Sequence, residues 1–100
     1  MFRIRYSEPA RQDLLDIADY LESRVGKRNT KAWLKRIRSR ARDLQHHALT
    51  YREREELGPG RRAVQVGPYM IFYRVIENSV IVQRILRGSR DLPRHLQNDT

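Results

Sequence analysis

The sequence of 100 residues contains no cysteine, which excludes disulfides and thiolate metal sites and makes the reducing cytoplasm the expected compartment. Long apolar runs are also missing, since none approaches the about 20 residues that a membrane-spanning helix needs. Arg3, Arg5 and Glu8 interrupt the first residues, so we expect no signal peptide. These absences predict one small soluble domain, near the size at which a single hydrophobic core suffices.

Negative charge is scarce. The chain has 12 Asp and Glu against 21 Lys and Arg, which gives a formal net charge of +9. Such an excess favours an acidic partner, either nucleic acid or an acidic protein segment. Arginine suits carboxylates and phosphates equally, so composition leaves these two partners open. A basic surface that serves only solubility is the third interpretation.

Signatures of cofactor and metal sites are absent as well. There is no glycine-rich phosphate loop, because the residues flanking Gly58-Pro59-Gly60 are wrong for one. His46 and His47 are adjacent, point in different directions on a helix end, and have no carboxylate at ligand spacing. The glutamates of residues 53–56 could include a general base, but we interpret them as part of a mixed-charge loop. We therefore expect no cofactor and no metal.

Three runs of β-branched and aromatic residues occupy positions 61–91, separated by turn signals at Gly67-Pro68 and Asn78-Ser79. This pattern is typical of a three-stranded antiparallel meander. The middle run, residues 69–76, is apolar at both alternating positions and is expected to be covered on both sides. Residues 2–6 alternate apolar and basic side chains, which predicts a short first strand with one buried face.

Helical periodicity fills the region between these strands. Apolar residues recur at helical spacing over residues 10–25, after an N-cap at Ser7 and a proline in the first turn. Gly26 is expected to end this helix, and a second helix is expected to begin at Asn29 or Thr30. The first helix is acidic outside and the second basic. Two helices joined by so few residues must lie antiparallel as a hairpin.

The predicted second helix also raises the question of nucleic-acid binding. Its basic face could follow a row of phosphates, although a charged run is commonly a solvated helix face. Trp33 is interpreted as a core residue between helices and sheet rather than as a stacking platform for a base. The basic residues on its outer faces are Lys31, Lys35, Arg36, Arg38, Arg40 and Arg42.

The predicted fold is α+β, with the order β-α-α-β-β-β in one domain at residues 1–96 and a flexible tail at residues 97–100. The two-helix hairpin packs on one face of a small, mainly antiparallel sheet, and the other face stays partly open as a groove. With the last hairpin turning at Asn78-Ser79, Tyr73 would face Arg84. The side chains expected on the open face are Met70, Phe72, Arg74, Ile81, Gln83, Ile85 and Arg87.

Three stretches carry a family resemblance that extends over nearly the whole chain: residues 6–10 (YSEPA), 66–75 (VGPYMIFYRV) and 84–93 (RILRGSRDLP). With the element order, they resemble the ParE branch of the ParE/RelE toxin superfamily. The resemblance implies a toxin of a type II toxin–antitoxin system. Such a toxin is held inactive by a small ParD-like antitoxin, whose disordered C-terminal part folds along the toxin surface.

The shared fold does not decide the activity, because ParE-like toxins act on DNA gyrase and RelE-like relatives cut messenger RNA in the ribosome. RelE-like cleavage needs cations around the reacting phosphate and groups that move protons. By resemblance, Met70 occupies the position of one required arginine, Arg90 matches a second, and the tail offers only His95 for the last group. The incomplete site favours a gyrase-binding toxin without catalytic residues. A RelE-like ribosome-dependent endoribonuclease and a plain nucleic-acid-binding module are the alternatives.

The predicted binding surface combines apolar anchors with arginines that pair with acids of the antitoxin or the target. DNA contact would be indirect, through the gyrase complex. Arg84 shares a face with apolar residues and could equally pair within the fold. The predicted antitoxin- or target-binding residues are Met70, Phe72, Arg74, Ile85, Arg87 and Arg90.

Overall fold

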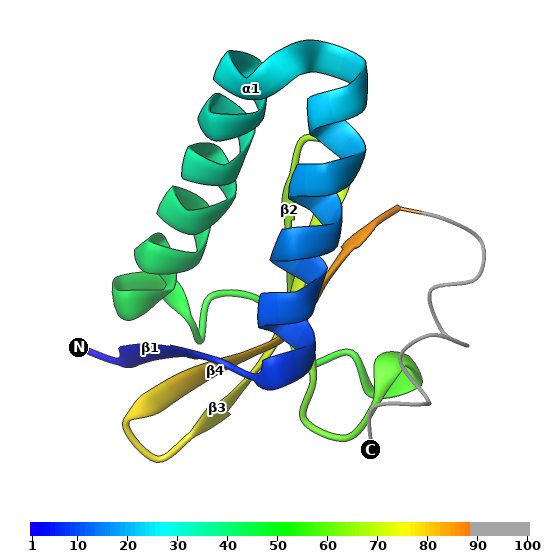
Figure 1. Cartoon of the computed structure of the whole chain (residues 1–100). Helices are drawn as coiled ribbons and strands as arrows, with labels where there is room; N and C mark the ends of the chain where they lie inside the picture. The colour runs from blue at the N-terminus through cyan, green and yellow to red at the C-terminus, as the bar shows by residue number, and fades with distance from the viewer. Residues whose placement is uncertain (89–100) are drawn as a thin grey trace.

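A computed structural model describes residues 1–88 of the chain. Its elements are β1 (Arg3–Tyr6), α1 (Glu8–His47), the 3-10 helix η1 (Glu55–Leu57), β2 (Arg62–Val66), β3 (Tyr69–Ile76) and β4 (Ser79–Arg87). The strands form one sheet in the order β1-β4-β3-β2, with α1 over one face (Figure 1). Among residues 1–88 only the β1–β4 pair is parallel, so the α+β class and the mainly antiparallel sheet are confirmed. The predicted tail at residues 97–100 lies outside the described residues.

Helix α1 is assigned as a single element of 40 residues, where two helices were expected. It starts as predicted, with the Ser7 side chain accepting a hydrogen bond from the backbone N of Ala10 at 3.2 Å. Gly26 alone leaves the helical conformation, with φ 83° and ψ 168°, a region that glycine tolerates best. The chain folds back there, and a first arm (residues 8–25) and a second arm (residues 27–47) stand beside each other (Figure 1).

The predicted new start at Asn29 or Thr30 is wrong. Helical structure resumes directly after Gly26, and the Thr30 hydroxyl donates a hydrogen bond to the Gly26 carbonyl at 2.8 Å. Asn29 similarly donates to the carbonyl of Val25 at 2.9 Å. These side-chain bonds serve carbonyls at the bend, so one glycine is enough to turn the helix and no loop is needed.

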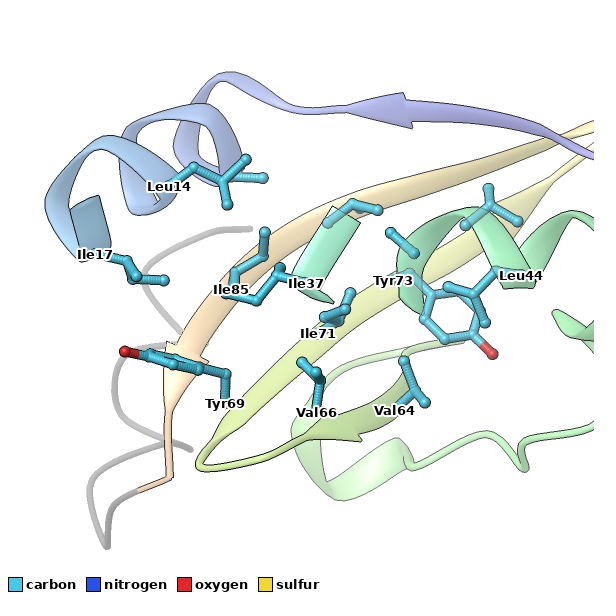
Figure 2. Packing of buried hydrophobic residues seen from close by; sticks show 14 of the residues in the cluster. Leu14, Ile17, Ile37, Leu44, Val64, Val66, Tyr69, Ile71, Tyr73 and Ile85 are labelled. Atoms are coloured by element: carbon cyan, nitrogen blue, oxygen red, sulfur yellow. The ribbon is translucent and has the colours of Figure 1, made fainter. Parts of the chain in front are cut away.

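The hydrophobic core lies between α1 and the face of the sheet beneath it (Figure 2). Most of the stability of helices in proteins comes from packing of an amphipathic face, so the two arms depend on this burial. Trp33 packs at the edge of the core, with its ring 5.9 Å from that of Tyr69, which agrees with the interpretation of Trp33 as a packing residue. The arms contribute Leu14, Ile17, Leu21, Ile37, Ala41 and Leu44, and the sheet contributes Val64, Val66, Tyr69, Ile71, Tyr73, Val80, Val82 and Ile85.

The hairpin between β3 and β4 turns one residue earlier than predicted. Ile76 pairs with Ser79, so the turn residues are Glu77 and Asn78. Glu77 has a φ of 54° and is the one non-glycine residue with positive φ in the described part of the chain. The Asn78-Ser79 turn expected from the sequence is therefore wrong, because Ser79 already belongs to the strand.

A β-bulge interrupts the pairing of β3 with β4. Tyr73 lies opposite Val82, whereas the preceding residue Phe72 lies opposite Arg84, so Gln83 is the extra residue on β4. Directly opposed residues point to the same face of a sheet. From Arg84 onward, the side chains of β4 therefore lie on the faces opposite to those predicted.

Asp13 occupies the edge of β4 that β1 leaves open. Strand β1 ends at Tyr6, opposite Val82. Further along β4, Asp13 Oδ2 accepts hydrogen bonds from the Ile85 backbone N at 2.9 Å and from Arg84 Nε at 2.8 Å, and Oδ1 accepts one from Arg84 Nη2 at 2.9 Å. The sequence predicts that the first helix is acidic outside. Asp13 is nevertheless only 7% exposed, because it joins the helix to the strand.

Tyr73 joins β3 to the end of the second arm. Its side chain is fully buried, and its hydroxyl donates a hydrogen bond to the Ala48 carbonyl at 2.6 Å. Burial raises the pKa of Tyr73 to about 12, because the phenolate would be poorly solvated. A tyrosine in the unfolded chain has a pKa of about 10. The protonated Tyr73 hydroxyl therefore stabilises the folded state fully below about pH 10, and this contribution is lost as the pH rises towards about 12.

We expect Tyr73→Phe to lower the free energy of unfolding at pH 7 by about 1 kcal/mol, through loss of one hydrogen bond. The variant should also lack a pH-dependent loss of about 2–3 kcal/mol between about pH 10 and 12, which corresponds to a pKa shift of two units. Urea unfolding across this pH range measures both effects. Tyr20→Phe, which removes an exposed hydroxyl, is the control. An alkaline loss in Tyr73→Phe as steep as in the parent would contradict the prediction.

Candidate functional site

The back face, defined as the sheet face turned away from α1, carries a second apolar cluster. Leu57 of η1 packs on Phe72, and Ala63, Met70 and Leu86 surround this pair. We call these five residues the back-face cluster. Phe72 is 0% exposed, whereas Met70 and Leu86 are only partly buried. The predicted groove is thus partly filled by the chain's own η1. The apolar surface that stays open is limited to the rim of the cluster, formed by Met70 and Leu86.

The bulge changes the position of two predicted binding residues. Ile85 lies opposite Ile71 and is 1% exposed in the core beneath α1, so its assignment to the open face is wrong. Arg87 is exposed but also lies on the helix side, with Nη1 3.5 Å from the Tyr20 hydroxyl. The neighbouring Leu86 takes the place on the back face that the sequence analysis gave to Ile85.

Two arginines adjoin the back-face cluster. Arg74 is partly buried, and its buried Nε has no hydrogen-bond partner among residues 1–88. The side chains of Arg74 and Arg61 both lie beside Gly58. A Cβ atom added to this glycine would be 3.5 Å from Arg74 Nη2 and 3.6 Å from Arg61 Nε. Arg61 is 1% exposed and donates hydrogen bonds to Gln83 Oε1 at 3.0 Å and to the Leu57 carbonyl at 3.3 Å. Two positively charged side chains therefore lie beside the same glycine at the back-face cluster.

The remaining arginines predicted from the sequence have different positions. Arg84 is bound to Asp13, so it pairs within the fold, which was one of its two interpretations. Arg90 and His95 lie outside the described residues. Sequence reasoning missed Arg61 and Leu86 as members of this site. Arg61 follows a glycine-rich turn with no periodicity, and Leu86 reaches the back face only because of the bulge.

The described residues contain no group of three or more side chains suited to holding a metal ion. His46 and His47 are exposed at the end of α1, as expected, with ring centroids 6.4 Å apart. In the same part of the chain, α1 is too polar to cross a membrane, and no other helix is long enough. What the back face offers is therefore a partly open apolar surface beside positive charge, which is the chemistry of a binding site for an acidic, amphipathic segment.

Comparison with known proteins adds a family to this geometry. Residues 4–92 match the family described as ParE toxin of type II toxin-antitoxin system, parDE. Toxin ParE3 of Caulobacter vibrioides is 30% identical over 100 residues, and the match covers the whole of both chains.

Two solved structures share the fold. The chromosomal ParDE toxin–antitoxin system from P. aeruginosa matches with a TM-score of 0.80 and 23% identity, over 89% of this chain and 98% of that one. The toxin–antitoxin complex RelBE2 from Mycobacterium tuberculosis matches with a TM-score of 0.64 and 22% identity, over 87% and 98% of the two chains. At such identities the likeness concerns the fold alone.

Proposed function

Because the chain belongs to the ParE toxin family of type II toxin–antitoxin systems, we propose that it inhibits DNA gyrase by binding and that a ParD-like antitoxin neutralises it. The main support for inhibition by binding, without catalysis, is the position and packing of Met70. By resemblance, this residue stands where RelE-like enzymes have an arginine, and it packs in a cluster of five apolar side chains. An apolar side chain neither stabilises phosphate charge nor moves a proton. The proposal places the protein in the cytoplasm, with the DNA on which gyrase works.

The antitoxin would bind at the rim of the back-face cluster. Met70 and Leu86 offer apolar contacts, and an acidic residue of the antitoxin would supply the acceptor that Arg74 Nε lacks within residues 1–88. Phe72 supports this surface from below. A segment that folds on binding loses about 2–5 kcal/mol to ordering, so burial of Met70 and Leu86 has to offset that loss. The matched ParDE and RelBE2 structures are themselves toxin–antitoxin systems, which supports an antitoxin as partner.

A supercoiling assay tests the proposed activity. The full chain, purified and freed of antitoxin, should block supercoiling by gyrase, and adding the antitoxin back should restore it. RNA in the same preparation should stay intact. Supercoiling that continues at saturating protein would contradict gyrase inhibition. The endoribonuclease alternative makes a separate prediction, namely codon-positioned transcript ends in cells that express the protein.

We expect Arg74→Ala to weaken antitoxin binding by about 1.5–3 kcal/mol, the usual contribution of a hydrogen bond to a charged group, or roughly 10- to 150-fold in Kd. Titration calorimetry of the full chain with the antitoxin measures this change. Arg52→Ala removes an exposed positive charge outside the back-face cluster and is the matched control. Equal Kd values for the two variants would show that Arg74 does not contact the antitoxin.

A further inference from the structure

The helix side of the molecule contains a groove that the proposed function does not use. It has a volume of about 530 Å³ and lies between β1 and the two arms of α1. Ile4, Tyr6 and Leu14 line its apolar part. A second hollow of about 320 Å³ continues along the second arm. The two hollows share Arg38 and Arg42, so we treat them as one surface, the basic groove.

Five cations and no acidic residue of the described chain line the basic groove. Arg11 comes from the first arm, and the other four, Lys31, Lys35, Arg38 and Arg42, come from the second. Arg11 also contacts the exposed Glu8 at 3.3 Å. The four cations of the second arm have no ion pair or hydrogen bond within residues 1–88. Their charges are therefore available to a ligand.

Other cations of the second arm are used inside the fold. The Arg36 guanidinium lies 4.2 Å above the Trp33 ring, and Arg40 donates hydrogen bonds to the Tyr51 hydroxyl at 3.2 Å and to the Gln65 carbonyl at 3.3 Å. The arm thus separates into a face whose arginines bind the protein itself and a face whose cations bind no described residue. Only the second face borders the basic groove.

Tyr6 also lines the basic groove, and its hydroxyl is a hydrogen-bond donor. Burial raises the pKa of Tyr6, and the positive charges of Arg38 and Arg42 oppose this rise. At neutral pH the hydroxyl keeps its proton and can donate to an anionic oxygen. Arg38 and Arg42 act electrostatically on this hydroxyl, so an anionic oxygen bound to it would also be attracted by both arginines.

The spacing of the cations favours one kind of polyanion. Lys31, Lys35, Arg38 and Arg42 follow one another at intervals of four, three and four residues, so they form a row about 17 Å long on one helix face. One strand of B-form DNA presents about five phosphates over that length. A phosphodiester backbone carries a charge at each nucleotide, whereas a peptide carries one only where it has Asp or Glu. An uninterrupted cationic row therefore matches nucleic acid better than an acidic protein segment.

We propose that the basic groove binds the phosphate backbone of double-stranded DNA directly and without sequence preference. Lys31, Lys35, Arg38 and Arg42 contact successive phosphates of one strand, and Arg11 closes the groove from the first arm. This activity goes beyond the proposed inhibition of gyrase, which requires contacts with protein only. It belongs to a different face of the molecule from the back-face cluster.

Fluorescence anisotropy with a labelled duplex of about 20 base pairs tests this proposal on the full chain. For five phosphate contacts, log K should fall with log salt with a slope of about −4.5. The variant Lys31→Gln/Lys35→Gln/Arg38→Gln/Arg42→Gln should reduce the slope to about −1 and the affinity in 0.1 M salt by about tenfold or more. Its matched control is Arg3→Gln/Arg5→Gln/Lys27→Gln/Arg28→Gln, which lowers the net charge equally, from +9 to +5.

The control should keep the parent's slope, since none of its four residues lines the basic groove. Equal losses in the two variants would overturn the proposal, because binding would then depend on net charge alone. Competition by polyglutamate as strong as that by unlabelled duplex would also overturn it, in favour of an acidic protein partner. If circular dichroism shows that the groove variant is unfolded, Arg38→Gln/Arg42→Gln replaces it, with a slope shallower by about two. The assay contains no gyrase, so its outcome does not depend on the proposed inhibition.

Discussion

Replacing Asp13 by alanine should lower the free energy of unfolding by about 3–5 kcal/mol, the usual effect of removing one partner of a buried ion pair. The Asp13 carboxylate accepts three hydrogen bonds, two from Arg84 and one from the backbone N of Ile85. Alanine would remove all three acceptors at a position that is 7% exposed. Domains of this size have stabilities of about 5–15 kcal/mol, so the variant would lose a large share of its stability.

Urea unfolding measures this loss, and Asp16→Ala is the matched control. Asp16 lies one helical turn further along α1, is exposed, and accepts a single hydrogen bond from Gln12 at 2.9 Å. Its replacement should change stability by less than about 0.5 kcal/mol. Asp13→Asn should fall between the two, because the amide keeps one acceptor oxygen. Similar stabilities for Asp13→Ala and Asp16→Ala would show that the carboxylate does not join α1 to β4.

Ile85→Asp and Leu86→Asp are expected to have opposite consequences although the residues are adjacent. Ile85 is 1% exposed in the core, and an unpaired carboxylate there should destabilise the protein by more than about 4 kcal/mol. Leu86 is only partly buried, at the rim of the back-face cluster. Leu86→Asp should therefore fold, with a loss of about 1–2 kcal/mol, and should bind the antitoxin at least about tenfold more weakly, because the proposed apolar anchor is lost.

Circular dichroism and urea unfolding separate the two variants, and titration with the antitoxin completes the test for Leu86→Asp. Ile76→Asp is the control, since Ile76 is 55% exposed and should accept a charge with little loss of stability. A folded Ile85→Asp together with an unfolded Leu86→Asp would contradict the bulge, because the strand would then have the register expected without it. Unchanged antitoxin affinity in a folded Leu86→Asp would contradict only the proposed docking surface.

Several features of the fold could be predicted because they depend on neighbouring residues. The bounds of β3 agree with the run at residues 69–76, since its apolar and β-branched composition is itself the signal. The N-cap at Ser7 follows from one side chain and the helix start beside it. The packing role of Trp33 was likewise predicted from its position among the apolar residues of the helix.

The composition of the candidate site could be predicted only in part. Met70, Phe72 and Arg74 lie on the back face as expected. They are alternate residues of β3, and successive side chains of a strand point to opposite faces of the sheet. Ile85 was placed on the wrong face, because one extra residue in β4 reverses every side chain beyond it. No residue type in the sequence marks Gln83 as that extra residue. The cover over Phe72 was also missed, since η1 belongs to a segment without periodicity.

The sequence by itself determined the class of the fold, the middle strand, the start of the helix, the positive charge and the family resemblance. Each of these features depends either on residues that are close together in the chain or on the overall composition. The tertiary structure alone decided the bulge at Gln83 and the burial of Asp13 against β4. These features depend on which distant side chains fill the core and which distant groups accept hydrogen bonds from a strand edge. The hydrogen bond from Ile85 to Asp13 joins residues 72 positions apart, and no local pattern in the sequence records such a pairing.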